Sequence, residues 1–176
     1  SEIEDVVRRI DELLREDKRR VDEVLERNRK LIEDDERLSR EIARELDEII
    51  KRLREVVKSN KEDRDTIRRL AEEAREVIER VDRENEKTKR ELEKHSREAL
   101  RENEDTIRRI TEELKTRIKV REEVRKLKER LDKILEDTRR LLEESKRRLD
   151  RLHERHRETS EDMKRRIDKL LEEVRK

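Results

Sequence analysis

The stretch LSREIARELDEIIKRLREVV, residues 38–57, decides the fold. Its main apolar residues recur at steps of three and four, at Leu38, Ile42, Leu46, Ile49, Leu53 and Val56. This spacing places them on one face of an α-helix, whereas a β-strand would alternate at every second residue. The same spacing continues from Ile3 near the start of the chain to Val174 near its end. We therefore expect an all-α protein whose helices each bury one apolar face.

The composition is that of helices with charged outer faces. The 176 residues include no Gly, Pro, Cys or aromatic residue, and 61% are charged while 28% are hydrophobic. Ordinary domains contain roughly 7% Gly and 5% Pro. The 54 Lys and Arg residues balance 53 Asp and Glu residues, and the two signs are interspersed, which favours ion pairs along helices over disorder. The lack of Cys excludes disulfides and thiolate metal sites.

Two segments are candidate turns. At 59–63, Asn60 tolerates the left-handed conformation that often ends a helix, and Asp63 or Asp65 can cap the next one. At 116–122, Val120 falls outside the apolar stripe. The pattern predicts one domain over residues 1–176, with helices at about 2–58, 63–117 and 121–175.

An antiparallel arrangement makes a further prediction about which residues share a level. With turns near 60 and 120, the numbers of facing residues sum to about 120 for the first two helices and about 241 for the last two. Apolar layers such as Ile10, Ile110 and Leu131 satisfy both sums. We expect an elongated antiparallel three-helix bundle of nearly straight helices, each roughly 80–90 Å long at 1.5 Å per residue.

Polar residues interrupt the apolar stripe, and they fall at shared levels as well. One predicted layer is Asp17, Asn103 and Thr138, and another is Asp35, Asn85 and His156. The remaining pairs are Thr88 with His153 and His95 with Ser145, with Asn28 within one helical turn of that last pair. A buried polar group left unpaired costs roughly 1–3 kcal/mol, so matched polar groups disfavour sliding of the helices. We interpret these residues as structural groups that specify register.

The three histidines raise two alternatives. His153 and His156 are spaced to face one metal ion, but His95 lies at another level, and zinc sites need three or four converging ligands. A hydrogen bond from His156 to Asn85 or to an acid is therefore the favoured interpretation over a metal site. Protonation of a buried histidine near pH 5–6 could also act as a pH switch, and this alternative stays open.

No motif points to catalysis or to a bound macromolecule. The chain has no Gly-rich phosphate loop and no nucleophile elbow, so we expect no enzyme activity, no cofactor and no metal. Residues 119–176 carry 21 Lys and Arg against 16 Asp and Glu, but the interleaved acids and missing aromatics argue against nucleic-acid binding. The acidic, amphipathic start SEIEDVVRRI is unlike a targeting peptide, and no apolar run approaches the roughly 18 residues of a membrane span.

Taken together, the Glu/Arg/Lys surface, the aliphatic core and the Asn, Thr, Ser and His layers resemble de novo designed helical bundles. The closest resemblance is to parametrically generated coiled-coil bundles that carry buried hydrogen-bond networks. It extends over the whole chain as a style of sequence, although such designs often place Gly or Pro in their loops. The resemblance implies a soluble scaffold, monomeric or self-assembling, with no natural location and cytoplasmic in an expression host. We expect a monomer that requires no partner, with self-association as the other outcome. The alternative is a coiled-coil interaction module that forms homo- or hetero-oligomers.

Overall fold

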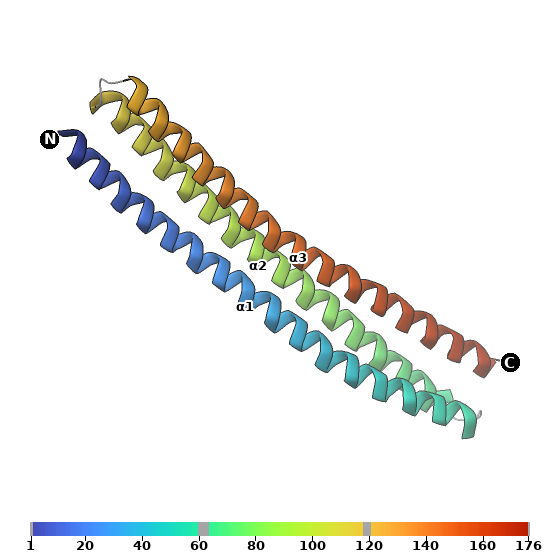
Figure 1. Ribbon diagram of the computed structural model, residues 1–176. Helices are drawn as coiled ribbons and strands as arrows, with labels where there is room; N and C mark the ends of the chain where they lie inside the picture. The colour runs from blue at the N-terminus through green and yellow to red at the C-terminus, as the bar shows by residue number, and fades with distance from the viewer. Residues whose placement is uncertain (1, 60–63, 118–120, 176) are drawn as a thin grey trace. The chain divides into compact units, whose positions relative to one another are not determined.

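A computed structural model of the chain contains three helices, α1 (Glu2–Ser59), α2 (Arg64–Arg117) and α3 (Arg121–Arg175) (Figure 1). The structure describes residues 2–59, 64–117 and 121–175, without the side chains of 2, 3, 174 and 175. Every described residue is helical, which confirms the predicted all-α three-helix bundle. The predicted turn residues Asn60, Asp63 and Val120 lie outside the described residues.

The helix ends carry charges that suit the helix dipole. Asp65 lies in the first turn of α2, and Glu122 and Glu123 lie in the first turn of α3. Basic residues occupy the last turns of α1 and α2, at Lys58, Lys115 and Arg117. Acidic groups near the positive N-terminus and basic groups near the negative C-terminus each stabilise a helix, typically by about 0.3–1 kcal/mol.

The chain forms two compact units, and each contains a segment of all three helices. The first unit comprises residues 1–30 and 91–148, and the second comprises residues 31–90 and 149–176. Each helix therefore contributes one half to each unit. The organisation of the whole chain as one elongated domain of nearly straight helices stays a prediction.

The core of the first unit shows how its helices run. Val6 and Ile10 of α1 pack with Ile110 and Leu114 of α2 and with Leu131 of α3. Low residue numbers in α1 thus meet high numbers in α2 and low numbers in α3. Within this unit, α1 is antiparallel to α2 and parallel to α3, as the predicted layer of Ile10, Ile110 and Leu131 requires.

The second unit has an aliphatic core of the same kind. Ile42 and Leu46 of α1 pack in one cluster with Ile78 of α2 and Ile167 of α3. Further along α1, Leu53 packs in a second cluster whose α2 members are the lower-numbered Ile67 and Leu70. As α1 ascends, its α2 neighbours descend, so these two segments are also antiparallel.

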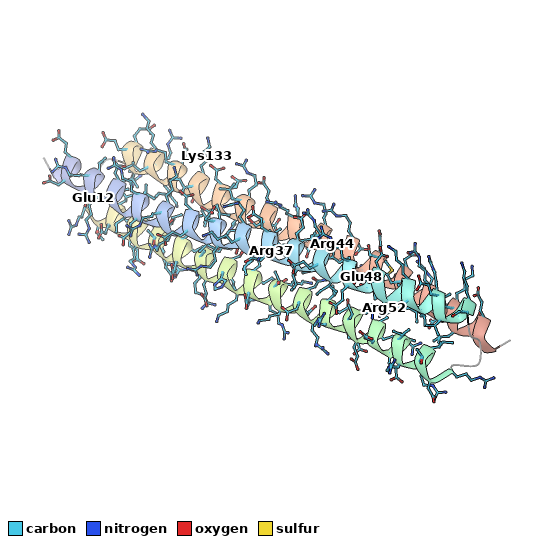
Figure 2. The ribbon with its side chains drawn as sticks, turned by 90° about the horizontal axis from the view of Figure 1, so that it is seen from below. Glu12, Arg37, Arg44, Glu48, Arg52 and Lys133 are labelled. Atoms are coloured by element: carbon cyan, nitrogen blue, oxygen red, sulfur yellow. The ribbon has the colours of Figure 1, made fainter. Side chains whose placement is uncertain are left out.

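The outer faces of the helices are charged. In Figure 2 the labelled side chains Arg37, Arg44, Glu48 and Arg52 extend outward from α1, and all four are exposed. Several ion pairs join helices across each unit, among them Arg80 with Glu45 at 2.9 Å. Such exposed pairs contribute about 0–1 kcal/mol each, so the buried side chains dominate stability. No helix, over the residues described, is long and apolar enough to cross a membrane.

Candidate functional site

The candidate site consists of polar side chains on the inner faces of the helices. Six of the eleven residues predicted for the polar layers are buried, namely Asp17, Asn28, Asp35, Asn85, Asn103 and Thr138. The other five are half-buried, namely Thr88, His95, Ser145, His153 and His156. Burial alone does not pair these groups, and their contacts differ between the two units.

In the second unit, polar residues gather around the carboxylate of Asp35. Thr88 Oγ1 donates a hydrogen bond to Asp35 Oδ1 at 3.3 Å, and His153 Nε2 lies 3.1 Å from Asp35 Oδ2. Asn85 completes the set with its amide nitrogen turned toward Asp35, where it donates to Oδ1 at 3.1 Å and to Oδ2 at 3.3 Å. The Asp35 side chain is only 1% exposed, so all three helices meet at a buried acceptor. We call Asp35, Asn85, Thr88 and His153 the Asp35 cluster.

Helical spacing explains why these residues meet. Asn85 and Thr88 are three residues apart on α2, and His153 and His156 are three apart on α3, so each pair lies on one helix face. An ionised carboxylate only accepts hydrogen bonds, and therefore His153 Nε2 carries the proton in its contact with Asp35. The cluster gives the buried carboxylate donors from both neighbouring helices, which offsets the cost of its burial.

His156 binds a different partner from the one predicted. Its Nδ1 lies 3.2 Å from the hydroxyl of Ser39, whereas Asn85 is bound to Asp35. The expected hydrogen bond from His156 to Asn85 or to an acid is thus replaced by one to Ser39. Burial lowers the pKa of His156, and the nearby His153 and Arg155 lower it further, while the charges of Asp35 and Glu36 oppose this effect. The imidazole is therefore neutral near pH 7.

In the first unit, Asp17 is the buried carboxylate. The amide nitrogen of Asn103 donates a hydrogen bond to Asp17 Oδ2, and the guanidinium of Arg20 lies 3.6 Å from Oδ1. Burial raises the pKa of Asp17, against the opposing effects of Asn103 and Arg20, and the charge of Glu102 adds to the rise. Asp17 thus has one neutral amide donor, whereas Asp35 has three side-chain donors. We call Asp17, Arg20 and Asn103 the Asp17 cluster.

Thr138 lies beside the Asp17 cluster without bonding to it. Asp17 and Thr138 line one groove between α1 and α3, but the Thr138 hydroxyl donates to the backbone carbonyl of Ile134 at 2.9 Å. Threonine in a helix commonly forms this bond to the residue four positions earlier. Of the predicted layer of Asp17, Asn103 and Thr138, two members are hydrogen-bonded and the third is only adjacent.

The level of Asn28 is also only partly as expected. Asn28 is fully buried and donates a hydrogen bond to the hydroxyl of Ser96 at 3.0 Å. His95 and Ser145 form no side-chain hydrogen bond within the described residues. Because adjacent helix residues point about 100° apart, Ser96 faces Asn28 while its neighbour His95 is turned toward the edge. Ser39, Ser96 and Arg20 were not predicted as members of the polar layers. Ser39 lies one helical turn from the predicted Asp35, and Arg20 lies one turn from the predicted Asp17.

The second unit contains a serine, two histidines and an aspartate close together, but their contacts are not those of a catalytic triad. A Ser–His–Asp triad requires one imidazole that contacts both the hydroxyl and the carboxylate. Here Ser39 contacts His156, whereas Asp35 contacts His153, and the two ring centres are 6.4 Å apart. The surrounding backbone is helical, so its N–H groups are bonded within the helices and cannot form an oxyanion hole. No group of three or more His, Asp or Glu side chains within the described ranges is placed to hold a metal ion.

In the comparisons with known proteins, no protein family matches the chain, and neither a curated protein nor a solved structure does.

Proposed function

We propose that the chain is a structural scaffold of designed origin, without a natural biochemical activity, in which buried polar clusters specify helix register. The observation that carries this proposal is the Asp35 cluster, where one buried carboxylate receives donors from both other helices of its unit. A shift of one helix by one turn, about 5.4 Å, would break the contacts of the cluster on that helix, and it could restore at most some of them. The native alignment supplies the Asp35 cluster and the contact of Ser39 with His156 together.

The composition supports a designed origin. A chain of 176 residues without Gly, Pro, Cys or aromatic residues uses only residues that favour helices, aliphatic core residues and a few polar groups. This is the alphabet that design rules assign to exposed and buried helix positions. The interspersed positive and negative charges also follow the rule of mixed surface charge.

Register is testable with spin labels, because the chain has no native Cys. Arg52 and Glu79 are exposed on α1 and α2 of the second unit, at levels offset along the helices, and can be replaced by Cys for labelling. In the parent chain we expect one narrow distance distribution by electron–electron double resonance. When Asp35, Asn85 and His153 become Leu and Thr88 becomes Val, we expect stability to be kept or raised but the distribution to gain distances displaced by about 5 Å.

The conservative variant Asp35→Asn serves as the matched control, since it keeps an acceptor oxygen for Thr88 or His153. It should retain the narrow distribution. A single narrow distance in the all-apolar variant would contradict the proposal, because the aliphatic face alone would then set the register.

The scaffold proposal also includes a monomeric state that requires no partner. Within the described residues, Leu141 is the one large hydrophobic side chain that is exposed, at 39%. We therefore expect light scattering to give the 21.9 kDa of one chain at micromolar concentrations. A mass of two or more chains would favour the alternative, a coiled-coil interaction module.

A further inference from the structure

The two units bury their ionisable groups in different ways. In the first unit the buried titratable group is an acid, Asp17, which has one amide donor and a guanidinium at 3.6 Å. Its Oδ1 accepts no hydrogen bond from the described part of the chain. In the second unit the buried acid, Asp35, has donors from three side chains, and a half-buried base, His156, is held against the neutral hydroxyl of Ser39. Acidification neutralises Asp17 and charges His156.

We propose that the two units respond to acidification in opposite directions: the first unit becomes more stable around Asp17 while the second becomes less stable around His156. This inference extends the scaffold proposal but does not depend on the origin of the chain. It rests on the contacts of the two buried groups, and the charged groups around each of them support it.

The surroundings of Asp17 disfavour its charge. On α1 the nearest cation is Arg20, which also lies 3.9 Å from Glu102 of α2 and donates to Thr106 at 3.3 Å. The guanidinium is therefore shared between two acids and a hydroxyl. The α3 side of the groove beside Asp17 presents Arg130, Asp137 and Thr138, which carry no net charge together. Proton uptake by Asp17 removes a buried charge that this environment compensates only in part.

Burial is the main reason that the surroundings of His156 disfavour a positive charge, and the neighbouring charged groups are mixed. Asp35 and Glu36 of α1 attract a proton, whereas His153 and Arg155 of α3 repel it. The Asp35 carboxylate is already engaged by His153, Asn85 and Thr88, so it has little capacity left for a charged His156. His153 lines a groove between α2 and α3. The charged residues of α2 that line this groove are Asp82, Glu86 and Lys89.

The direction of each effect follows from proton linkage. Because burial raises the pKa of Asp17 above its unfolded value, the folded first unit takes up a proton first as the pH falls, and its stability rises. The pKa of His156 is lowered, so the unfolded form takes up a proton first, and the second unit loses stability as the pH falls below about 6.5. At neutral pH and above, the buried charge of Asp17 destabilises the first unit, whereas the neutral imidazole of His156 does not destabilise the second.

Native-state hydrogen exchange between pH 7.5 and 4.5 tests the proposal, with rates corrected for intrinsic exchange at each pH. Relative to Asp17→Asn, we expect the parent chain's amides near Asp17 to become more protected on acidification, by more than about threefold. Relative to His156→Asn, amides near His156 should become less protected by a similar factor. The parent chain and each variant share the same surface carboxylates, so the titration of these groups cancels in both comparisons.

Two control variants test whether the loss of any acid or of any histidine has the same effect. Asp132→Asn removes an exposed acid of the first unit, and His95→Asn removes a half-buried histidine that has no side-chain hydrogen bond within the described residues. Neither variant should remove the opposite changes in protection near Asp17 and near His156. The proposal is overturned if the two units shift in the same direction, if Asp17→Asn leaves the profile unchanged, or if both units open with equal free energy at every pH.

Discussion

Replacement of Asp35 with leucine should lower the free energy of unfolding by about 3–5 kcal/mol, because three side-chain donors lose one buried acceptor. The substitution leaves the amide of Asn85, the hydroxyl of Thr88 and Nε2 of His153 without their acceptor. Each of these donors is partly or wholly removed from water, and an unsatisfied buried donor costs about 1–3 kcal/mol. Urea denaturation followed by circular dichroism at 222 nm measures the loss.

The adjacent Asp34 provides a matched control for this substitution. Asp34 is exposed, and its contact is an ion pair with Arg37 at 3.3 Å one turn along α1. Asp34→Leu introduces the same side chain one residue away and should change the free energy of unfolding by no more than about 0.5 kcal/mol. Equal effects of the two substitutions would mean that the Asp35 cluster contributes nothing beyond the charge of its carboxylate.

The aliphatic core of the bundle could be predicted from the sequence because its pattern is periodic and its packing is undirected. A residue such as Ile10 or Leu131 is buried when it lies on the apolar face, whatever its rotamer. The sums that relate facing residues hold because α1 and α2 are antiparallel with equal rise per residue. These two facts suffice to place Ile10, Ile110 and Leu131 in one cluster.

The contacts of the polar groups could be predicted only to the level at which each lies. A hydrogen bond depends on direction, and a change of one residue turns a helical side chain by about 100°. Ser96, rather than its neighbour His95, therefore faces Asn28. Thr138 lies at the predicted level, yet its hydroxyl donates to the backbone carbonyl of Ile134 on its own helix. This bond competes with a bond to another helix, and the spacing of residues does not reveal which of the two forms.

The different hydrogen bonding of the two buried carboxylates could not be predicted from the sequence either. Asp17 and Asp35 are the same residue type at equivalent interruptions of the apolar stripe. They differ because Asp35 has donors from both neighbouring helices of its unit, whereas the hydrogen bond to Asp17 comes from α2 alone. On α3, His153 contacts Asp35 across the core, whereas the Thr138 hydroxyl donates to the backbone carbonyl of Ile134 on its own helix.

A second large effect is expected in the core of the first unit, where Leu131→Ala should lower the free energy of unfolding by about 2–5 kcal/mol. Leu131 is 1% exposed and packs with Ile10 and Ile110 from the other two helices. Its truncation removes apolar contacts and leaves a cavity, because long helices held by many other contacts cannot collapse around one site.

Leu141 allows the same substitution to be made on the same helix without a cavity. Leu141 is 39% exposed at the edge of the groove between α1 and α3, so Leu141→Ala removes less buried area than Leu131→Ala. We expect a loss below about 1 kcal/mol, partly offset by the higher helix propensity of alanine. The two variants should therefore differ in urea midpoint while sharing one m-value. A loss at Leu141 as large as that at Leu131 would contradict the monomeric core, because it would mean that another surface covers Leu141 in solution.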